Sequence, residues 1–170
     1  MRTLLDLFAL SPYGRPPSRR SRLAPYNFSM SDQKSDALSE ALPQTLSHGA
    51  IVRQGEYAWD LNAFPAALQK APDLGYACLG GQFWFLLSDG SLYEPFWLEA
   101  NSGERGANEA WPDYKARSCS EVANAFETLV KETDFEKEAA QFKSLQVPFS
   151  VLFNAYFVTE AELVRLGLQR

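Results

Sequence analysis

The order of the patterns along the sequence predicts an α+β fold, in which a small antiparallel sheet from the first half packs against helices from the second half. Two observations indicate hairpins: Gln54-Gly55 separates the short runs AIVR and EYAW, and Asp89-Gly90 separates two strongly aromatic runs. The second half shows the spacing of apolar side chains that is typical of amphipathic helices. Strands that precede helices in this way are expected of an α+β domain.

Charge divides the chain into an arm and a body. Residues 1–29 carry five arginines against one aspartate, a net charge of +4, whereas residues 30–170 carry eleven basic and twenty acidic side chains, a net charge of −9. We interpret residues 1–29 as disordered or as lying before a natural start at Met30, with an organelle transit peptide as the alternative. Residues 30–170 are expected to form a single globular domain.

The composition also limits the classes of function. No window approaches the roughly 18 consecutive apolar residues that a membrane span needs, so no membrane partner is expected. An acidic body repels phosphate backbones, and we expect a basic protein partner in place of nucleic acid. Two cysteines and one histidine are too few for a disulfide framework or a structural zinc site. These counts favour a reduced, cytoplasmic protein that binds no metal or cofactor, and they leave the oligomeric state open.

Capping residues and prolines predict two short helices before the aromatic runs. Ser35 can cap a short helix over residues 36–42, which Pro43 ends or interrupts. After the first hairpin, residues 62–71 have helical spacing, with Pro65 tolerated in the first turn.

The stretch YACLGGQFWFLLSDGSLYEPFWLEA, residues 76–100, is expected to form the central hairpin, with a bulge or bend at Gly80-Gly81. A four-residue loop pairs Leu87 with Leu92 and Phe85 with Glu94, and side chains alternate across each strand. The predicted core face carries Phe83, Phe85, Leu87, Leu92, Glu94, Phe96 and Leu98. The predicted outer face carries Gln82, Trp84, Leu86, Tyr93, Pro95, Trp97 and Glu99.

Pro95 predicts that the second strand lies at an edge of the sheet, or is bulged there. Proline has no N–H to donate to a neighbouring strand. Edges of sheets are places where partners add.

Helices are expected over most of the second half. Ser118 and Glu121 have capping-box spacing, which predicts that a helix with an apolar stripe begins there. A second helical segment covers residues 135–145. Residues 148–158, PFSVLFNAYFV, fit both a helix and a buried strand, and their spacing favours the helix. Another capping box, at Thr159 and Glu162, predicts the last helix, which Gly167 closes.

The candidate binding residues are aromatic and acidic side chains on or after the outer face. Trp and Tyr are enriched at the energetic centres of interfaces, and carboxylates suit a basic partner. These residues are Trp84, Tyr93, Trp97, Glu99, Glu104, Glu109 and Trp111. The alternative is that helices cover the outer face as a second core layer.

Two groups are candidates for chemistry. Glu94, facing Phe85 on the core side, would be desolvated with a raised pKa, as in a pocket acid or base; its alternative is a structural ion pair with an arginine. Glu99 would lie on the opposite face and would not converge with it. Cys119 in the first turn of a helix could be activated by the helix dipole if His48 reached it, although a small apolar role for Cys119 is favoured.

The run LGYACLGGQFWFLLSDGSLYEPFWLEA, followed by WPDYKARSCSEVANAF, resembles bacterial toxin-immunity proteins in general style over residues 74–126. That resemblance implies a small, acidic, cytoplasmic protein that neutralises a cognate toxin by binding it, and it assigns no residue roles. The leading hypothesis is therefore a non-enzymatic, acidic protein-binding domain. A small-ligand domain or enzyme with a pocket at Glu94 is the second hypothesis, and assembly through the edge strand is the third.

Overall fold

The computed structural model describes residues 41–142 and 148–168. The arm of residues 1–29, and all but the last two residues of the helix expected over 36–42, lie outside these ranges. The strands are β1 (Ala50–Arg53), β2 (Glu56–Asp60), β3 (Ala77–Leu87), β4 (Leu92–Tyr93), β5 (Glu99–Asn101) and β6 (Phe149–Val158). The helices are α2 (Gln44–Ser47), α3 (Phe64–Lys70), α4 (Trp111–Glu132), α5 (Phe135–Ala139) and α6 (Glu160–Arg165).

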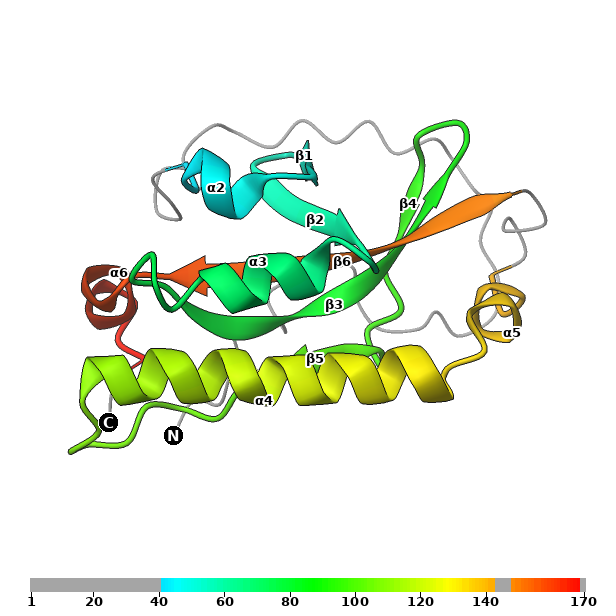
Figure 1. Cartoon of the computed structure of the whole chain (residues 1–170). Coiled ribbons are helices and arrows are strands. Elements are labelled where there is room, and N and C mark those ends of the chain that lie inside the picture. The colour runs from blue at the N-terminus through cyan, green and yellow to red at the C-terminus, as the bar shows by residue number, and fades with distance from the viewer. Residues whose placement is uncertain (1–40, 143–147, 169–170) are drawn as a thin grey trace. The chain divides into compact units, whose positions relative to one another are not determined.

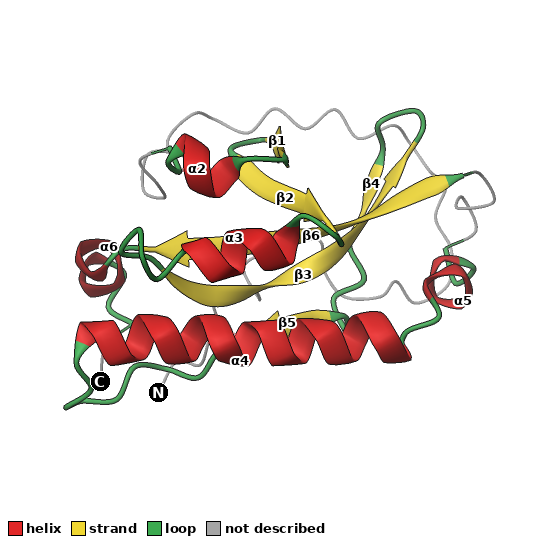
Figure 2. Cartoon of the chain, viewed as in Figure 1, coloured by secondary structure: helices red, strands yellow, loops and turns green. Residues whose placement is uncertain are grey.

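The strands form one antiparallel sheet, which confirms the predicted α+β class. The order across the sheet is β1-β2-β6-β3-β4, and β5 pairs with β3 on the same side as β4. The two long strands, β3 and β6, lie side by side at the centre (Figure 2). Helices α3 and α4 lie along one face of the sheet (Figure 1).

The main core lies between this face and the two helices. Its centre is a group of four phenylalanines, one each from α3, β3, α4 and β6: Phe64, Phe83, Phe126 and Phe153. The ring centroid of Phe153 is 4.5 Å from that of Phe64, 5.0 Å from that of Phe83 and 5.1 Å from that of Phe126. Because fully burying one such side chain is worth roughly 1.5–3 kcal/mol, this cluster is a main source of stability.

Turn chemistry explains the first hairpin. Gln54 and Gly55 both have positive φ, 52° and 84°, as a two-residue turn that matches the twist of the strands requires. β1 and β2 pair on either side of this turn, from Ala50 opposite Trp59 to Arg53 opposite Glu56. The predicted hairpin is confirmed.

The central hairpin also turns at Asp89-Gly90, but its register differs from the prediction by one residue. Leu86 lies opposite Leu92 and Phe85 opposite Tyr93. The amide of Leu87 donates to the carbonyl of Ser91 (2.9 Å), so these two residues pair and the loop between them, residues 88–90, has one residue fewer than expected. Since a one-residue slip moves every side chain of a strand to the other face, Tyr93 faces the main core, and Leu92 lies on the outer face.

The chain leaves the sheet between β4 and β5, and this break corrects two further predictions. Pro95 is buried in the break, at the edge of the sheet where it was expected. Phe96, expected in the core, is 49% exposed. Glu94 and Glu99 lie on the same face, because Glu99 is opposite Gln82 in the sheet and the side-chain amide of Gln82 donates to Glu94.

The predicted bulge at the glycine pair is confirmed by a register shift between Cys78 and Gly80. A Cβ at Gly81 would lie 1.9 Å from the backbone oxygen of Asn154, so no larger residue fits between β3 and β6 there. Gly80 has a φ of 129°, which only glycine adopts without strain.

Helix α4 begins seven residues before the predicted capping box. Its first turn contains Pro112, which is well suited to that position. Ser118 lies inside the helix, where its hydroxyl donates to the carbonyl of Lys115 (3.2 Å) and accepts from the amide of Cys78 (3.3 Å). The Ser118–Glu121 spacing therefore does not mark a helix start.

Residues 149–158 form a strand, so the preference for a helix there is wrong. Alternate side chains of β6, from Phe149 to Phe157, all contact the main core, and both edges of the strand pair with β2 and β3. The capping box that follows is confirmed: the hydroxyl of Thr159 accepts from the amide of Glu162, and the Glu162 carboxylate accepts from the amide of Thr159.

Candidate functional site

The structure separates the predicted aromatic anchors. Trp84 is only 2% exposed and packs on the outer face of the sheet with Ala58 and Leu152. Tyr93 is half-buried against the main core, with its ring 5.6 Å from that of Phe142. Trp84 and Tyr93 are therefore not exposed anchors.

Trp97 is the predicted anchor that remains on the surface, together with its neighbour Phe96. Trp97 is 51% exposed, and its ring stacks on Phe142 with 5.9 Å between centroids and 7° between planes. Its indole N–H donates to the carboxylate of Glu138 on α5 (2.8 Å). We call Phe96, Trp97, Phe142 and Glu138 the Trp97 surface. It holds one indole in a fixed orientation while leaving the other side of the ring accessible.

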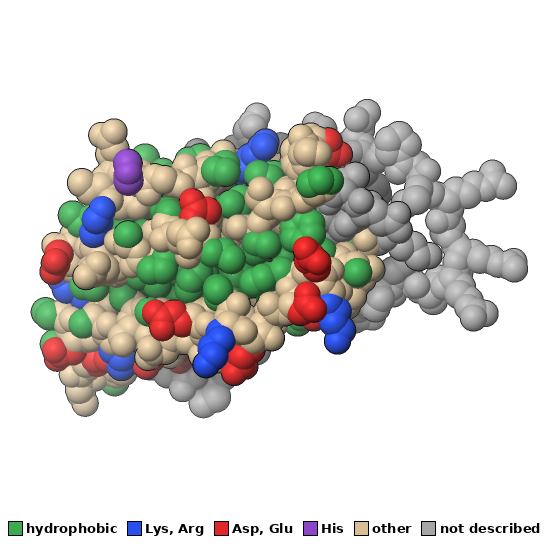
Figure 3. Space-filling view, turned by 45° about the vertical axis from the view of Figure 1, so that its right-hand side comes forward, with side chains coloured by type: hydrophobic (Ala, Val, Ile, Leu, Met, Phe, Trp, Pro, Cys, Tyr) green, Lys and Arg blue, Asp and Glu red, His purple; other side chains and the backbone are tan. Residues whose placement is uncertain are grey.

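Hydrophobic side chains also gather in a band between α3 and α4, with acidic and basic side chains around it (Figure 3). Half-buried side chains that pack against the main core include Leu129 and Val130 on α4, and Phe135 on α5. Patches of this kind on a monomer frequently mark interaction sites.

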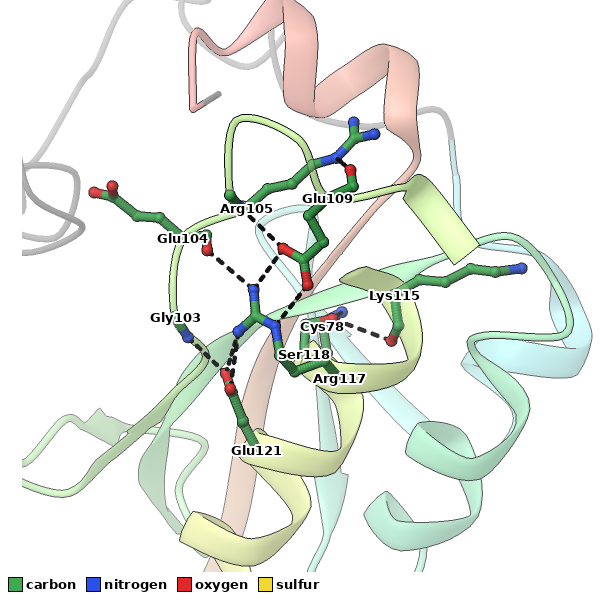
Figure 4. Close-up of polar contacts among 10 residues, drawn as sticks. Cys78, Gly103, Glu104, Arg105, Glu109, Lys115, Arg117, Ser118 and Glu121 are labelled. Carbon is green, nitrogen blue, oxygen red and sulfur yellow. Dashed lines mark hydrogen bonds and ion pairs between the residues drawn. The ribbon is translucent and has the colours of Figure 1, made fainter. Parts of the chain in front are cut away.

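The predicted acidic contacts Glu104 and Glu109 lie in a loop that Arg117 of α4 holds in place (Figure 4). The guanidinium of Arg117 donates to both carboxylate oxygens of Glu109 (2.7 and 2.8 Å), to the carboxylate of Glu121 (2.8 and 2.9 Å) and to the backbone oxygen of Glu104 (3.0 Å). The amide of Gly103 donates to Glu121 (2.8 Å). We call these contacts the Arg117 clamp.

The clamp gives Glu109 a structural role. Hydrogen bonds from Arg117, and then from the backbone of Gly106, lower the pKa of Glu109 to about 2. A carboxylate already satisfied in this way has little to offer a partner. The carboxylate of Glu104 points away from Arg117 (Figure 4). Trp111, another predicted contact, is half-buried with the guanidinium of Arg105 5.5 Å from its ring centroid.

Five side chains on the outer face of the sheet form a polar group that we call the acceptor cluster. They are Glu56 on β2, Gln82 on β3, Glu94 after β4, and Asn154 and Tyr156 on β6. Asn154 lies opposite both Ala58 and Gln82, so it occupies the middle of this group. Gln82 donates to Glu94 (3.1 Å), and the hydroxyl of Tyr156 donates to Glu56 (2.9 Å).

The two carboxylates of this cluster are held in an unfavourable environment. Burial raises the pKa of Glu94, the charge of Glu56 raises it further, and the hydrogen bond from Gln82 opposes both. Burial also raises the pKa of Glu56, against the hydrogen bond from Tyr156. The raised pKa expected for Glu94 therefore arises on the outer face, beside a second carboxylate, and the expected arginine partner is replaced by the amide of Gln82.

Sequence reasoning missed Glu56, Asn154 and Tyr156. The sequence could have indicated two of them, because Asn154 and Tyr156 in FNAYF are two residues apart, and residues two apart in a strand lie on the same face. The preference for a helix removed that signal.

The cysteines show no sign of activation. Cys119 lies in the third turn of α4, 5% exposed, and burial raises its pKa to about 11. Burial also raises the pKa of Cys78. The dipole effect expected for Cys119 is absent because the helix begins eight residues earlier. Among residues 41–142 and 148–168, no group of three or more His, Cys, Asp or Glu side chains could hold a metal ion.

In the part of the chain that the structure describes, none of the helices has the length and apolar character needed to cross a bilayer. Comparisons with models of protein families, with curated proteins and with solved structures find no match for this chain.

Proposed function

We propose that this chain is a non-enzymatic protein-binding domain that contacts a basic partner through the Trp97 surface. The observation that carries the proposal is the adjacent pair Phe96 and Trp97, 49% and 51% exposed at the edge of the sheet. Large aromatic side chains supply much of the energy of protein interfaces. Stacking on Phe142 fixes the indole before binding, which reduces the entropy lost when a partner docks.

Charge supports a basic partner. Residues 30–170 carry a net charge of −9, and α5, beside Trp97, adds Glu136 and Glu138 against Lys137. Opposite charge on a partner speeds its encounter and favours it over acidic competitors. The resemblance to immunity proteins extends this proposal to a toxin as the partner. A toxin encoded beside this protein should lose its effect on growth when the two are co-expressed.

A capture experiment with matched variants tests the proposal. The full chain is immobilised and exposed at low salt to a lysate of the cells that produce it, and captured proteins are quantified by mass spectrometry. We expect a specific protein whose recovery falls with Phe96→Ser and Trp97→Ala and declines as salt is added. Val52→Ser should leave recovery unchanged, because Val52 is 55% exposed on β1, at the other edge of the sheet.

Circular dichroism and thermal melting of each variant check that the fold is retained, since Trp97 also contacts Phe142 and Glu138. If no captured protein depends on Phe96 and Trp97, or if Val52→Ser has the same effect, the Trp97 surface is not the binding surface.

A further inference from the structure

The acceptor cluster has more hydrogen-bond acceptors than donors, and no ion pair among the described residues neutralises its two carboxylates, although Arg53 lies opposite Glu56 in the β1–β2 pairing. Within the described ranges, the ion pairs are Arg105–Glu160, Arg117–Glu109 and Arg117–Glu121, and none involves Glu56 or Glu94. Each side-chain donor group of the cluster already makes a hydrogen bond within the protein: Gln82 donates to Glu94, Tyr156 donates to Glu56, and the amide nitrogen of Asn154 donates to the carbonyl of Tyr57 (3.0 Å). Each carboxylate can accept about four hydrogen bonds, so acceptor capacity remains on both.

An independent observation points to a missing donor. Asn154 is 0% exposed, and its side-chain oxygen has no hydrogen-bond partner. The side-chain oxygen of Asn101, opposite Gly80 on the same face, is also buried without a partner. A buried acceptor left unsatisfied costs about 1–3 kcal/mol, so native proteins seldom retain one without a reason.

We propose that the acceptor cluster is a binding site for a guanidinium group. A guanidinium would form the ion pair that Glu56 and Glu94 do not make with the described residues, and it has five N–H donors and no acceptor. It would place N–H groups on the two carboxylates and on the side-chain oxygen of Asn154 between them.

The spacing of the cluster favours a guanidinium over a metal ion or an ammonium group. Glu56 is on β2 and Gln82 is on β3, with β6 between them, so the strands that carry them are about 10 Å apart at the usual strand spacing. A metal ion requires ligands around one point, and the described residues contain no such group of acidic, histidine and cysteine side chains. An ammonium group donates from one atom, whereas a guanidinium spreads its donors over a plane.

The guanidinium could belong to an arginine residue of a protein or to a free guanidino compound. Trp84, the next residue on this face of β3, has a buried indole N–H without an acceptor. A peptide carbonyl next to the arginine side chain would supply one. We therefore expect an arginine with flanking amides to bind more tightly than a bare guanidinium.

Titrations monitored by NMR test the site directly on the full chain. The probes are methylguanidinium, N-acetyl-arginine amide, and tetramethylammonium, which has the same charge but no N–H donor. We expect the side-chain amide signals of Gln82 and Asn154 to shift saturably with the first two probes. N-acetyl-arginine amide should bind several-fold more tightly if the source is a peptide; equal affinities would indicate a free guanidino compound.

Variants identify the carboxylates. Glu56→Gln and Glu94→Gln should each weaken methylguanidinium binding on the order of tenfold, because each removes a charged hydrogen-bond acceptor. Glu127→Gln is the matched control, since Glu127 is exposed on α4 and outside the cluster. A second measurement uses the unmodified protein and so does not depend on a variant that folds. Carboxyl 13C titrations should show that the pKa of Glu94 falls when methylguanidinium saturates the site.

The site is refuted if the Gln82 and Asn154 signals do not saturate with methylguanidinium. It is also refuted if tetramethylammonium shifts them equally, or if Glu127→Gln has the same effect as Glu94→Gln. These experiments involve no protein partner, so a negative result leaves the proposal for the Trp97 surface unaffected.

Discussion

At the scale of single residues, Glu94 shows how strongly the environment of a side chain depends on the turn that precedes it. With a four-residue loop, Glu94 would face Phe85 in the core, where an unpaired charge is very costly. The shorter loop, which pairs Leu87 with Ser91, places it on the outer face, where Gln82 donates to it and Glu56 repels it. Local sequence identified the turn at Asp89-Gly90, but the number of residues in the loop depends on contacts made by the whole sheet.

This environment predicts that Glu94→Gln stabilises the protein at neutral pH. The folded-state pKa of Glu94 is raised, so the folded protein holds more protons than the unfolded chain at pH values above about 4.5, and the free energy of unfolding falls as pH rises toward 7. Glutamine can still accept from Gln82 but carries no charge. Urea unfolding should therefore show a higher midpoint for the variant at pH 7. Near pH 3 the midpoints should not differ, because Glu94 of the unmodified protein is then protonated and uncharged in both the folded and the unfolded state. Glu127→Gln should change neither value, and a lower midpoint for Glu94→Gln at pH 7 would contradict the account.

At the scale of elements, the segments that could be predicted are those whose signals are local. Gln54-Gly55 determines its hairpin because the turn requires positive φ at both residues, and Thr159 with Glu162 determines the start of α6 because both partners lie within one turn. β6 could not be predicted in the same way. Its partners β2 and β3 lie some 60 to 100 residues earlier in the chain, and its aromatic spacing also fits a helix. The acceptor cluster depends on this strand, so it could not be assembled from the sequence either.

The Arg117 clamp is a further element-scale feature, because one helical side chain orders the loop between β5 and α4. Arg117→Lys preserves the charge but cannot donate from a planar fork to Glu109 and Glu121 at once. We expect amide hydrogen exchange at Gly103 and Gly106 to accelerate on the order of tenfold or more, since these amides donate to the same two carboxylates. Exchange at Leu163, whose amide donates to Thr159 within α6, should not change. Equal exchange at Gly103 and Gly106 in both proteins would show that the loop is ordered without the clamp.

At the scale of the whole molecule, one core joins both halves of the described chain. The rings of Phe64, Phe83, Phe126 and Phe153 come from segments that span most of the sequence, and each contacts at least two of the others. α3, α4, β3 and β6 therefore cannot separate from one another without exposing this cluster. The two fully buried tryptophans of the sheet lie on opposite faces, Trp59 in the main core and Trp84 on the outer face, so fluorescence monitors both sides of the sheet.

This arrangement predicts a single cooperative unfolding transition that depends strongly on Phe153. Fluorescence and far-UV circular dichroism should give coincident urea transitions, as expected of a two-state domain. Phe153→Ala should lower the free energy of unfolding by about 3–5 kcal/mol, because it removes the ring that touches the other three. A typical domain has only about 5–15 kcal/mol in total, so this variant would be close to unfolded. Val52→Ala, at an exposed position on β1, should change stability by about 0.5 kcal/mol or less. Separate transitions for the two probes would contradict a single cooperative unfolding step. A loss below about 1 kcal/mol for Phe153→Ala would mean that the phenylalanine cluster is not a main source of stability.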